Sequence, residues 1–176
     1  MLEGLFSLAQ IAGYVALVTY VAAYAIRDDN KLKIAFSASN VLWVVHYYLI
    51  GAQTAAVTTA IIILRNLFSL NSPDFSFKKK CLLLLIFSVL LIAAGIFTWA
   101  GWISVIPVFC CIAITYGVFF LSGLQLRTVF LVCDMAWLAH GIVVVSYGGI
   151  VYALGAVIVN AFTMRSMQKT RLSAGL

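Results

Sequence analysis

Two short segments of the sequence place polar and aromatic residues at one shared spacing. The first is N-V-L-W-V-V-H, from Asn40 to His46, and the second is D-M-A-W-L-A-H, from Asp134 to His140. Each has an amide or acid, a tryptophan three residues later and a histidine after three more, and these are the only two histidines in the chain. Amide, carboxyl and imidazole groups exchange hydrogen bonds or protons, and indoles stack on flat rings. The pattern is therefore typical of two walls of a pocket for a small polar ligand.

The composition indicates that these segments lie in a membrane. Hydrophobic residues make up 65% of the 176 residues, charged residues make up 9%, and the mean hydropathy is +1.13. Soluble domains average about 45–50% apolar and about 25% charged residues. A chain of this kind buries apolar surface against lipid, so we expect an integral membrane protein.

The lengths of the apolar segments predict helices. A helix needs about 20 mostly apolar residues to cross roughly 30 Å of hydrocarbon. Seven segments satisfy this, at about 5–26, 33–50, 53–70, 81–99, 103–121, 126–145 and 148–165. Alternating segments of about ten residues, which a membrane β-barrel requires, are not visible. We therefore predict an all-α protein with seven transmembrane helices.

The positions of Lys and Arg orient these helices. With the N-terminus outside and seven spans, all of them fall on the cytoplasmic side and the outer loops carry none. They are Arg27, Lys31, Lys33, Arg65, Lys78, Lys79, Lys80, Arg127, Arg165, Lys169 and Arg171. The C-terminus is then cytoplasmic, and the net charge of +6 reflects this asymmetry rather than nucleic-acid binding. We expect the run 78–80 to contact anionic lipid headgroups.

The displacement of 94 residues between Asn40 and Asp134 aligns other residues too. It pairs Asn66 with Asn160, and it pairs Gly13 with Pro107, two helix-weakening residues that are our hinge candidates. We therefore predict two parallel three-helix repeats joined by a linker helix, a 3+1+3 layout that some transporters use. The expected boundaries are 1–71 for the first repeat, 72–101 for the linker with the fourth helix, 102–166 for the second repeat and 167–176 for a cytoplasmic tail.

Several short motifs occur in the order and spacing of a known family. They are R-D at Arg27–Asp28, V-H at Val45–His46, Arg65, W-L-A-H at Trp137–His140, G-G at Gly148–Gly149, Asn160 and M-Q-K at Met167–Lys169. On these residues the chain resembles the bacterial inner-membrane YgjV family over nearly its whole length. Its layout resembles the SWEET, PQ-loop and PnuC-like transporter superfamily. The resemblance implies a SWEET-like fold in the bacterial inner membrane.

The resemblance also implies which residues face the substrate. In SWEET-like transporters an asparagine on the third helix of each unit and a tryptophan on the second do so, and the matching residues are Asn66, Asn160, Trp43 and Trp137. One feature departs from that pattern, because neither first helix holds a Pro-Gln pair. Only the proline at 107 remains, followed by a valine, and a glycine stands at the matching position 13.

A rise of about 1.5 Å per residue sorts the polar residues into layers. Asn40 lies about 10 Å into the second span, the tryptophan about 15 Å and the histidine about 20 Å, and the third span brings Asn66 level with Asn40. The predicted substrate-binding residues are Asn40, Trp43, His46, Asn66, Asp134, Trp137, His140 and Asn160. Each has a structural alternative: amides as interhelical hydrogen bonds, tryptophans as packing, and histidines bonded to backbone carbonyls. Two histidines make an incomplete metal site, so we expect no metal.

Two charged residues require separate expectations. Asp134 is the only acid deep in any predicted span, and intramembrane carboxylates are costly and usually functional. It is our candidate for proton coupling; the structural alternative is an Asp paired with a Tyr, Ser or Arg. Arg65 stands near the end of the third span, and we expect its long side chain to reach the cytoplasmic surface rather than line the path.

These residues favour a transporter for a small polar solute, nucleoside-, vitamin- or sugar-like, that works by alternating access and is a candidate for proton linkage. The first alternative is a membrane protein of the same fold that senses a ligand or binds a partner without transport. An intramembrane enzyme is less favoured, because such hydrolases gather several His and Asp residues around a metal, or a Ser with its base. We expect no catalytic residues and no cofactor, and a homo-oligomer is left open.

Overall fold

The computed structural model describes residues 8–49, 53–97, 99, 101–102, 105–143 and 147–173. Seven α-helices and one 3-10 turn account for most of this part of the chain, and it contains no strand. The helices are α2 (Leu8–Ala23), α3 (Asp29–Leu49), α4 (Gln53–Ser69), α5 (Phe77–Phe97), α6 (Val105–Phe120), α7 (Gly123–Val143) and α8 (Tyr147–Ser173), with the turn η1 (Ser72–Asp74) between α4 and α5. For the described residues, the prediction of an all-helical protein with seven helices is confirmed.

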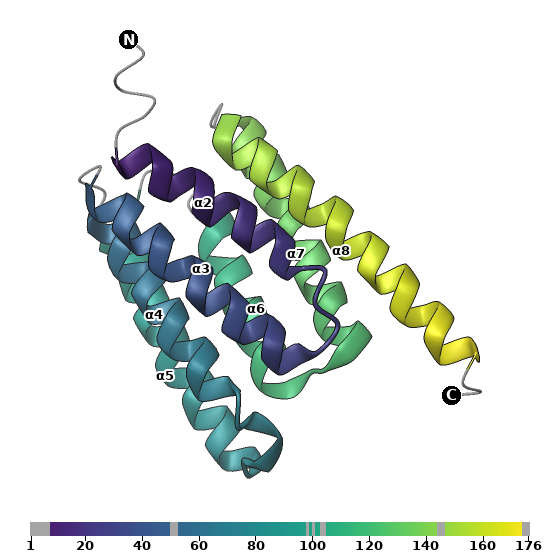
Figure 1. Cartoon of the computed structure of the whole chain (residues 1–176). Coiled ribbons are helices and arrows are strands. Elements are labelled where there is room, and N and C mark those ends of the chain that lie inside the picture. Colours follow the sequence, from purple (N-terminus) through teal and green to yellow (C-terminus); the bar gives the residue numbers. More distant parts are fainter. Residues whose placement is uncertain are drawn as a thin grey trace.

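The helices pack in sequence order around the bundle (Figure 1). Each helix from α2 to α7 contacts the next one along the chain, α8 packs back against α2, and α4 also contacts α6. α3 therefore lies between α2 and α4, and α7 lies between α6 and α8. The two Trp–His motifs thus lie on α3 and α7, and each of these helices packs between the helices before and after it.

Helix ends differ from the predicted spans where polar residues continue or cap a helix. α3 begins at Asp29, four residues before the predicted span, because the Asp28 carboxylate accepts a hydrogen bond from the Lys31 N–H at 2.7 Å and caps the first turn. α8 continues to Ser173, past the predicted end at 165, since the residues after the apolar segment are mostly good helix formers. Apolar length locates a membrane span, but it does not mark where the helix ends.

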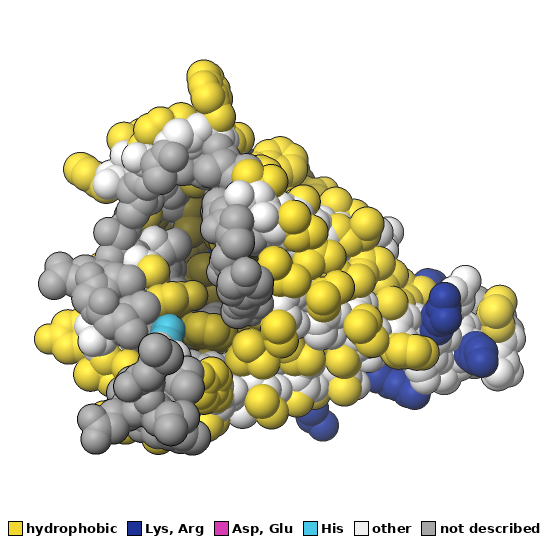
Figure 2. All heavy atoms as spheres, turned by 90° about the horizontal axis from the view of Figure 1, so that it is seen from above, with side chains coloured by type: hydrophobic (Ala, Val, Ile, Leu, Met, Phe, Trp, Pro, Cys, Tyr) yellow, Lys and Arg dark blue, Asp and Glu magenta, His cyan; other side chains and the backbone are white. Residues whose placement is uncertain are grey.

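The outer surface of the bundle is largely apolar (Figure 2). By length and composition, Phe77–Phe97 and Ile150–Ser173 are long and apolar enough to cross a membrane, and only 11% and 22% of these windows are buried inside the protein. On α5 the side chains of Leu85 and Phe97 are 61% and 88% exposed. Water disfavours an apolar surface of this extent, whereas lipid does not.

The centre of the bundle is an aromatic cluster. Phe36 on α3 and Phe130 on α7 meet edge to face with ring centroids 5.5 Å apart, and both contact the ring of Tyr24. Leu32 and Leu126, one turn earlier on the same helices, are fully buried. Phe36 and Phe130, like the two leucines, are related by the displacement of 94 residues, so the two middle helices meet through equivalent positions.

Candidate functional site

Two buried cations reach across the bundle at the end where Lys and Arg side chains gather (Figure 2). The ammonium of Lys33, on the second turn of α3, donates to the backbone carbonyls of Ser69 on α4 and Val118 on α6, both at 3.1 Å. The last carbonyls of a helix have no partner within the helix, and a cation there also complements the helix dipole. Lys33 therefore ties α3 to the C-terminal ends of two helices.

Arg127 makes the matching contact from α7. Its guanidinium is fully buried and donates to the carbonyl of Tyr24 at 2.8 Å and to the carbonyl of Ile26, just beyond the end of α2. The displacement of 94 residues takes Lys33 to Arg127 and Tyr24 to Val118. The two bonds are therefore reciprocal, each cation binding the carbonyl that corresponds to the other's acceptor.

An acid lies near both cations. Asp29 is an electrostatic neighbour of both Lys33 and Arg127, and its Oδ2 accepts a hydrogen bond from the Gly123 N–H at 2.6 Å. Gly123 has a φ of 55°, which L side chains rarely adopt, so the turn into α7 requires glycine there. We call Lys33, Arg127 and Asp29 the basic-end clamp.

Asp134 lies deeper in the bundle among tyrosines. It is 2% exposed, and Tyr24 is its electrostatic neighbour. Tyr20 and Tyr152 lie beside it, with ring centroids 5.4 Å apart. Asp134 Oδ2 is buried and has no hydrogen-bond partner among the described residues. The structure thus places Asp134 among tyrosines, as the structural alternative expects, and leaves its Oδ2 unpaired; its role stays a prediction.

The two Trp–His pairs have nearly the same geometry. Trp43 and His46 meet edge to face at 5.5 Å and 81°, and Trp137 and His140 meet at 5.5 Å and 75°. All four side chains are partly buried. His46 Nδ1 lies 2.7 Å from the carbonyl of Ala9, which is the backbone bond of the structural alternative.

The amides of the predicted site have incomplete hydrogen bonding. Asn160 donates to the carbonyl of Arg127 at 3.0 Å, but its Oδ1 is unpaired. Asn40 is 5% exposed, and its Nδ2 lacks a partner within the described part of the chain. In these same ranges no hydrogen bond joins two of the eight predicted residues. Their joint role in binding stays a prediction.

The expectation for Arg65 is wrong. Its side chain does not extend to the surface but is 4% exposed. The guanidinium donates to Asn66 Oδ1 through Nε at 3.2 Å and Nη2 at 2.8 Å, and to Thr115 Oγ1 through Nη1 at 3.3 Å. Snorkelling fails because α4 packs against α3, α5 and α6, and these neighbours enclose the side chain.

The hinge candidates lie in continuous helices. α2 runs through Gly13 without a break, and Pro107 stands in the first turn of α6, where a proline removes no intrahelical hydrogen bond. Gly13 has a packing reason instead, because a Cβ there would lie 2.8 Å from His46 Nδ1. Whether either residue acts as a hinge stays a prediction.

This close approach gives a testable coupling. We expect Gly13→Ala to lower stability by about 1 kcal/mol or more, because the new methyl group displaces an imidazole held by the Ala9 carbonyl. In a His46→Ala background the same change should be neutral or stabilising, since alanine is the better helix former by about 1 kcal/mol. Thermal melts of the four proteins in one detergent measure the coupling. Equal effects in both backgrounds would contradict the contact.

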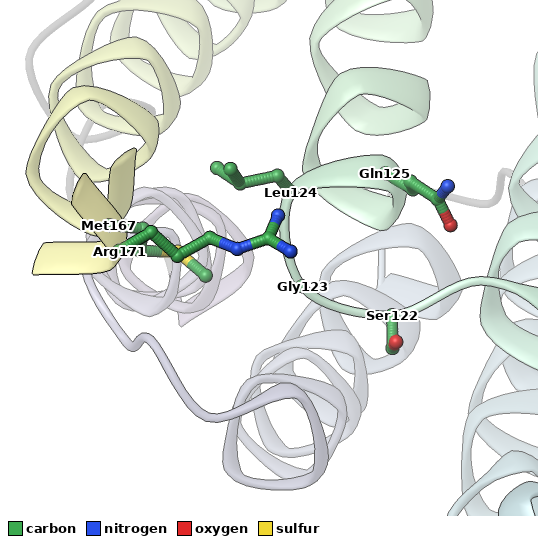
Figure 3. A pocket seen from close by; sticks show the side chains of 6 residues that line it. All are labelled: Ser122, Gly123, Leu124, Gln125, Met167 and Arg171. Atoms are coloured by element: carbon green, nitrogen blue, oxygen red, sulfur yellow. The ribbon is translucent and has the colours of Figure 1, made fainter. Parts of the chain in front are cut away.

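Two clefts on the described surface lie away from these residues. One, of about 350 Å³, lies at the basic end between the start of α7 and the end of α8, where Arg171 reaches toward Leu124 (Figure 3). The other is a shallow surface along α8 from Phe162 to Leu172. Neither contains a predicted site residue. Among the described residues no group of three or more His, Cys, Asp or Glu side chains could hold a metal.

Sequence reasoning missed the polar partners at the centre of the bundle. Tyr20, Tyr24 and Tyr152 stand in apolar segments where a tyrosine resembles any other packing residue. The displacement of 94 residues relates Lys33 to Arg127, but their acceptors are backbone carbonyls, which carry no sequence signal.

Comparison with known proteins identifies the family. A family model described as "Bacterial inner membrane protein", Imp-YgjV, matches residues 7–171. The chain belongs to the Imp-YgjV family. It is 25% identical over 142 residues to the inner membrane protein YgjV of Escherichia coli K12, covering 81% of this chain and 74% of that protein. No solved structure matches it. The Imp-YgjV assignment confirms the predicted location in the bacterial inner membrane and accounts for the apolar exterior of the bundle.

Proposed function

We propose that this protein transports a small polar solute across the inner membrane by alternating access between two three-helix units, α2–α4 and α6–α8, with α5 as the linker. The proposal rests on one observation above all. Lys33 and Arg127 close the basic end of the bundle through reciprocal bonds from one unit to the other. A reciprocal pair of this kind can break and form as a unit, which a transporter gate requires.

The distribution of polar contacts supports this reading. Every hydrogen bond recorded between the two units in the described part of the chain lies near the basic end; besides the clamp these are Arg65 to Thr115 and Arg27 to Ser166. The opposite end is hollowed, and a histidine side chain is visible there (Figure 2). By the positive-inside rule the basic end faces the cytoplasm, so in the proposed cycle the clamp closes the cytoplasmic side.

A binding screen followed by counterflow tests the proposal. Purified protein is melted in the presence of nucleosides, vitamins, sugars and amino acids, and each stabilising solute is then tested for exchange in proteoliposomes. We expect at least one solute to bind and to exchange. A solute that binds without exchange would instead support a ligand-sensing protein, and binding of none would contradict both.

Two variants test the predicted binding residues. We expect Trp137→Ala and Asn160→Ala to weaken binding of the stabilising solute about fivefold or more while the protein still inserts and purifies. A stacking face or a hydrogen bond to the ligand contributes about 1 kcal/mol or more each. Trp99→Ala is the matched control, because Trp99 is 52% exposed and packs only on Trp102 among the rings described. Unchanged affinity in both variants would reduce these two residues to packing.

A further inference from the structure

The structure holds one buried cation whose charge no described group balances. Lys33 and Arg127 each bind backbone carbonyls at helix ends and share the neighbouring carboxylate of Asp29. Arg65 has neither kind of partner: its recorded acceptors are the amide oxygen of Asn66 and the hydroxyl of Thr115, both neutral. No carboxylate of the described residues lies within ion-pair distance of it.

A buried arginine cannot remove this cost by losing its proton. The guanidinium stays charged in proteins, whereas a buried carboxyl can become neutral. An intramembrane cation without a counter-charge is expensive, and such residues usually mark a ligand or ion path. The charge of Arg65 therefore favours an anion from outside, since no described residue supplies one.

The groups around Arg65 are donors rather than acceptors. Asn66 uses its oxygen to accept two of the guanidinium bonds, which leaves its Nδ2, buried in a residue only 2% exposed, without a partner. Arg65 itself has five N–H groups, of which three are used. An anion beside them would accept from both residues and satisfy the charge and the unpaired amide together.

The position of Arg65 suits a ligand that enters from the hollowed end. It stands four residues before the end of α4 at Ser69, so it lies about 6 Å inward from the clamp. Tyr20 is an electrostatic neighbour of both Arg65 and Asp134, so both charged groups lie in the surroundings of one tyrosine. Arg65 thus lies beside the predicted binding residue Asn66, close to the basic end.

We propose that Arg65 and the Nδ2 of Asn66 form an anion subsite, so that the solute carries a carboxylate or a phosphate group. This inference rests on the proposed function only in treating the bound anion as a transported solute. The subsite binds an anion whether or not transport follows. The two tryptophans of the predicted site favour a solute in which the anionic group is attached to a flat ring.

Matched aromatic probes test the subsite on the purified full-length protein. Benzoate and benzamide have nearly the same shape and differ in charge, and phenyl phosphate replaces the carboxylate with a phosphate. We expect benzoate or phenyl phosphate to bind at least tenfold more tightly than benzamide in calorimetric titrations. Preference for one anion identifies the group that the solute carries. Equal binding of benzoate and benzamide, or binding of neither anion, would overturn the proposal without any variant.

Variants assign the preference to Arg65. Arg65→Gln should weaken binding of the preferred anion at least tenfold, which corresponds to about 1.4 kcal/mol, and Arg65→Lys should retain part of it. The matched control is Arg165→Gln, an exposed arginine on α8 that should leave binding unchanged. Wild-type affinity in Arg65→Gln would overturn the assignment.

The two proposals fail in different ways. Anion binding that depends on Arg65, without counterflow of any solute, would contradict transport and leave the subsite standing. Counterflow of a neutral solute that persists in Arg65→Gln would support transport and contradict the anion subsite.

Discussion

Replacing Arg127 with leucine should open the basic end of the bundle. The guanidinium is fully buried and holds two carbonyls beyond the end of α2, and each charge-assisted bond contributes about 1.5–3 kcal/mol. Loss of even one such bond corresponds to at least a tenfold change in the population of the open state. We therefore expect a cysteine at Val118, which is 1% exposed in the closed bundle, to react with a maleimide at least ten times faster in Arg127→Leu.

The labelling experiment needs a background without reactive native thiols. Cys81, Cys110, Cys111 and Cys133 are free, so they are replaced first, and the protein is placed in nanodiscs, where the reagent reaches both ends. Val118→Cys leaves the backbone carbonyl that accepts from Lys33 in place. Arg165→Leu is the control, since that arginine is exposed. Lys33→Met provides a second, milder release of the clamp. Labelling no faster than in the control in both variants would show that the clamp does not hold this end closed.

Replacing Asp134 with asparagine should uncouple transport from protons. The amide keeps the shape of the carboxylate and its place beside Tyr24, but it cannot bind and release a proton. A gradient of one pH unit supplies about 1.4 kcal/mol, enough for tenfold accumulation of a solute exchanged with one proton. We expect the wild-type protein to accumulate the solute found by the screen and Asp134→Asn only to equilibrate it.

The control separates loss of coupling from loss of function. Counterflow at equal pH on both sides should persist in Asp134→Asn, because exchange needs no net proton movement. Asp74→Asn removes an exposed acid in η1 and should leave accumulation unchanged. Accumulation that survives in Asp134→Asn would exclude this residue as the coupling site.

The helices could be predicted because their signal is long. Seven apolar segments of about 20 residues locate α2 to α8 within a few residues, and only ends set by polar residues differ, such as the cap at Asp28. Family membership and the inner-membrane location follow from the same segments and from motifs such as W-L-A-H.

The polar centre could be predicted only in part. Asp134, Asn40 and Asn160 are conspicuous by type in an apolar chain, and the structure buries all three. The environment of Arg65 could not be predicted, because its burial depends on α4 packing against three other helices. Likewise, the acceptors of Lys33 are carbonyls far along the chain, and no residue type marks them.

Distances between spin labels at the two ends of the bundle test alternating access most directly. One pair is placed at the exposed positions Lys31 and Gln125 near the clamp, and the other at Tyr48 and Ile142, which are 70% and 58% exposed at the opposite end. Both pairs are measured in nanodiscs with and without Arg127→Leu. The account predicts that the variant lengthens the first distance and shortens the second. A longer distance at the basic end with no change at the other, or no change at either, would contradict it.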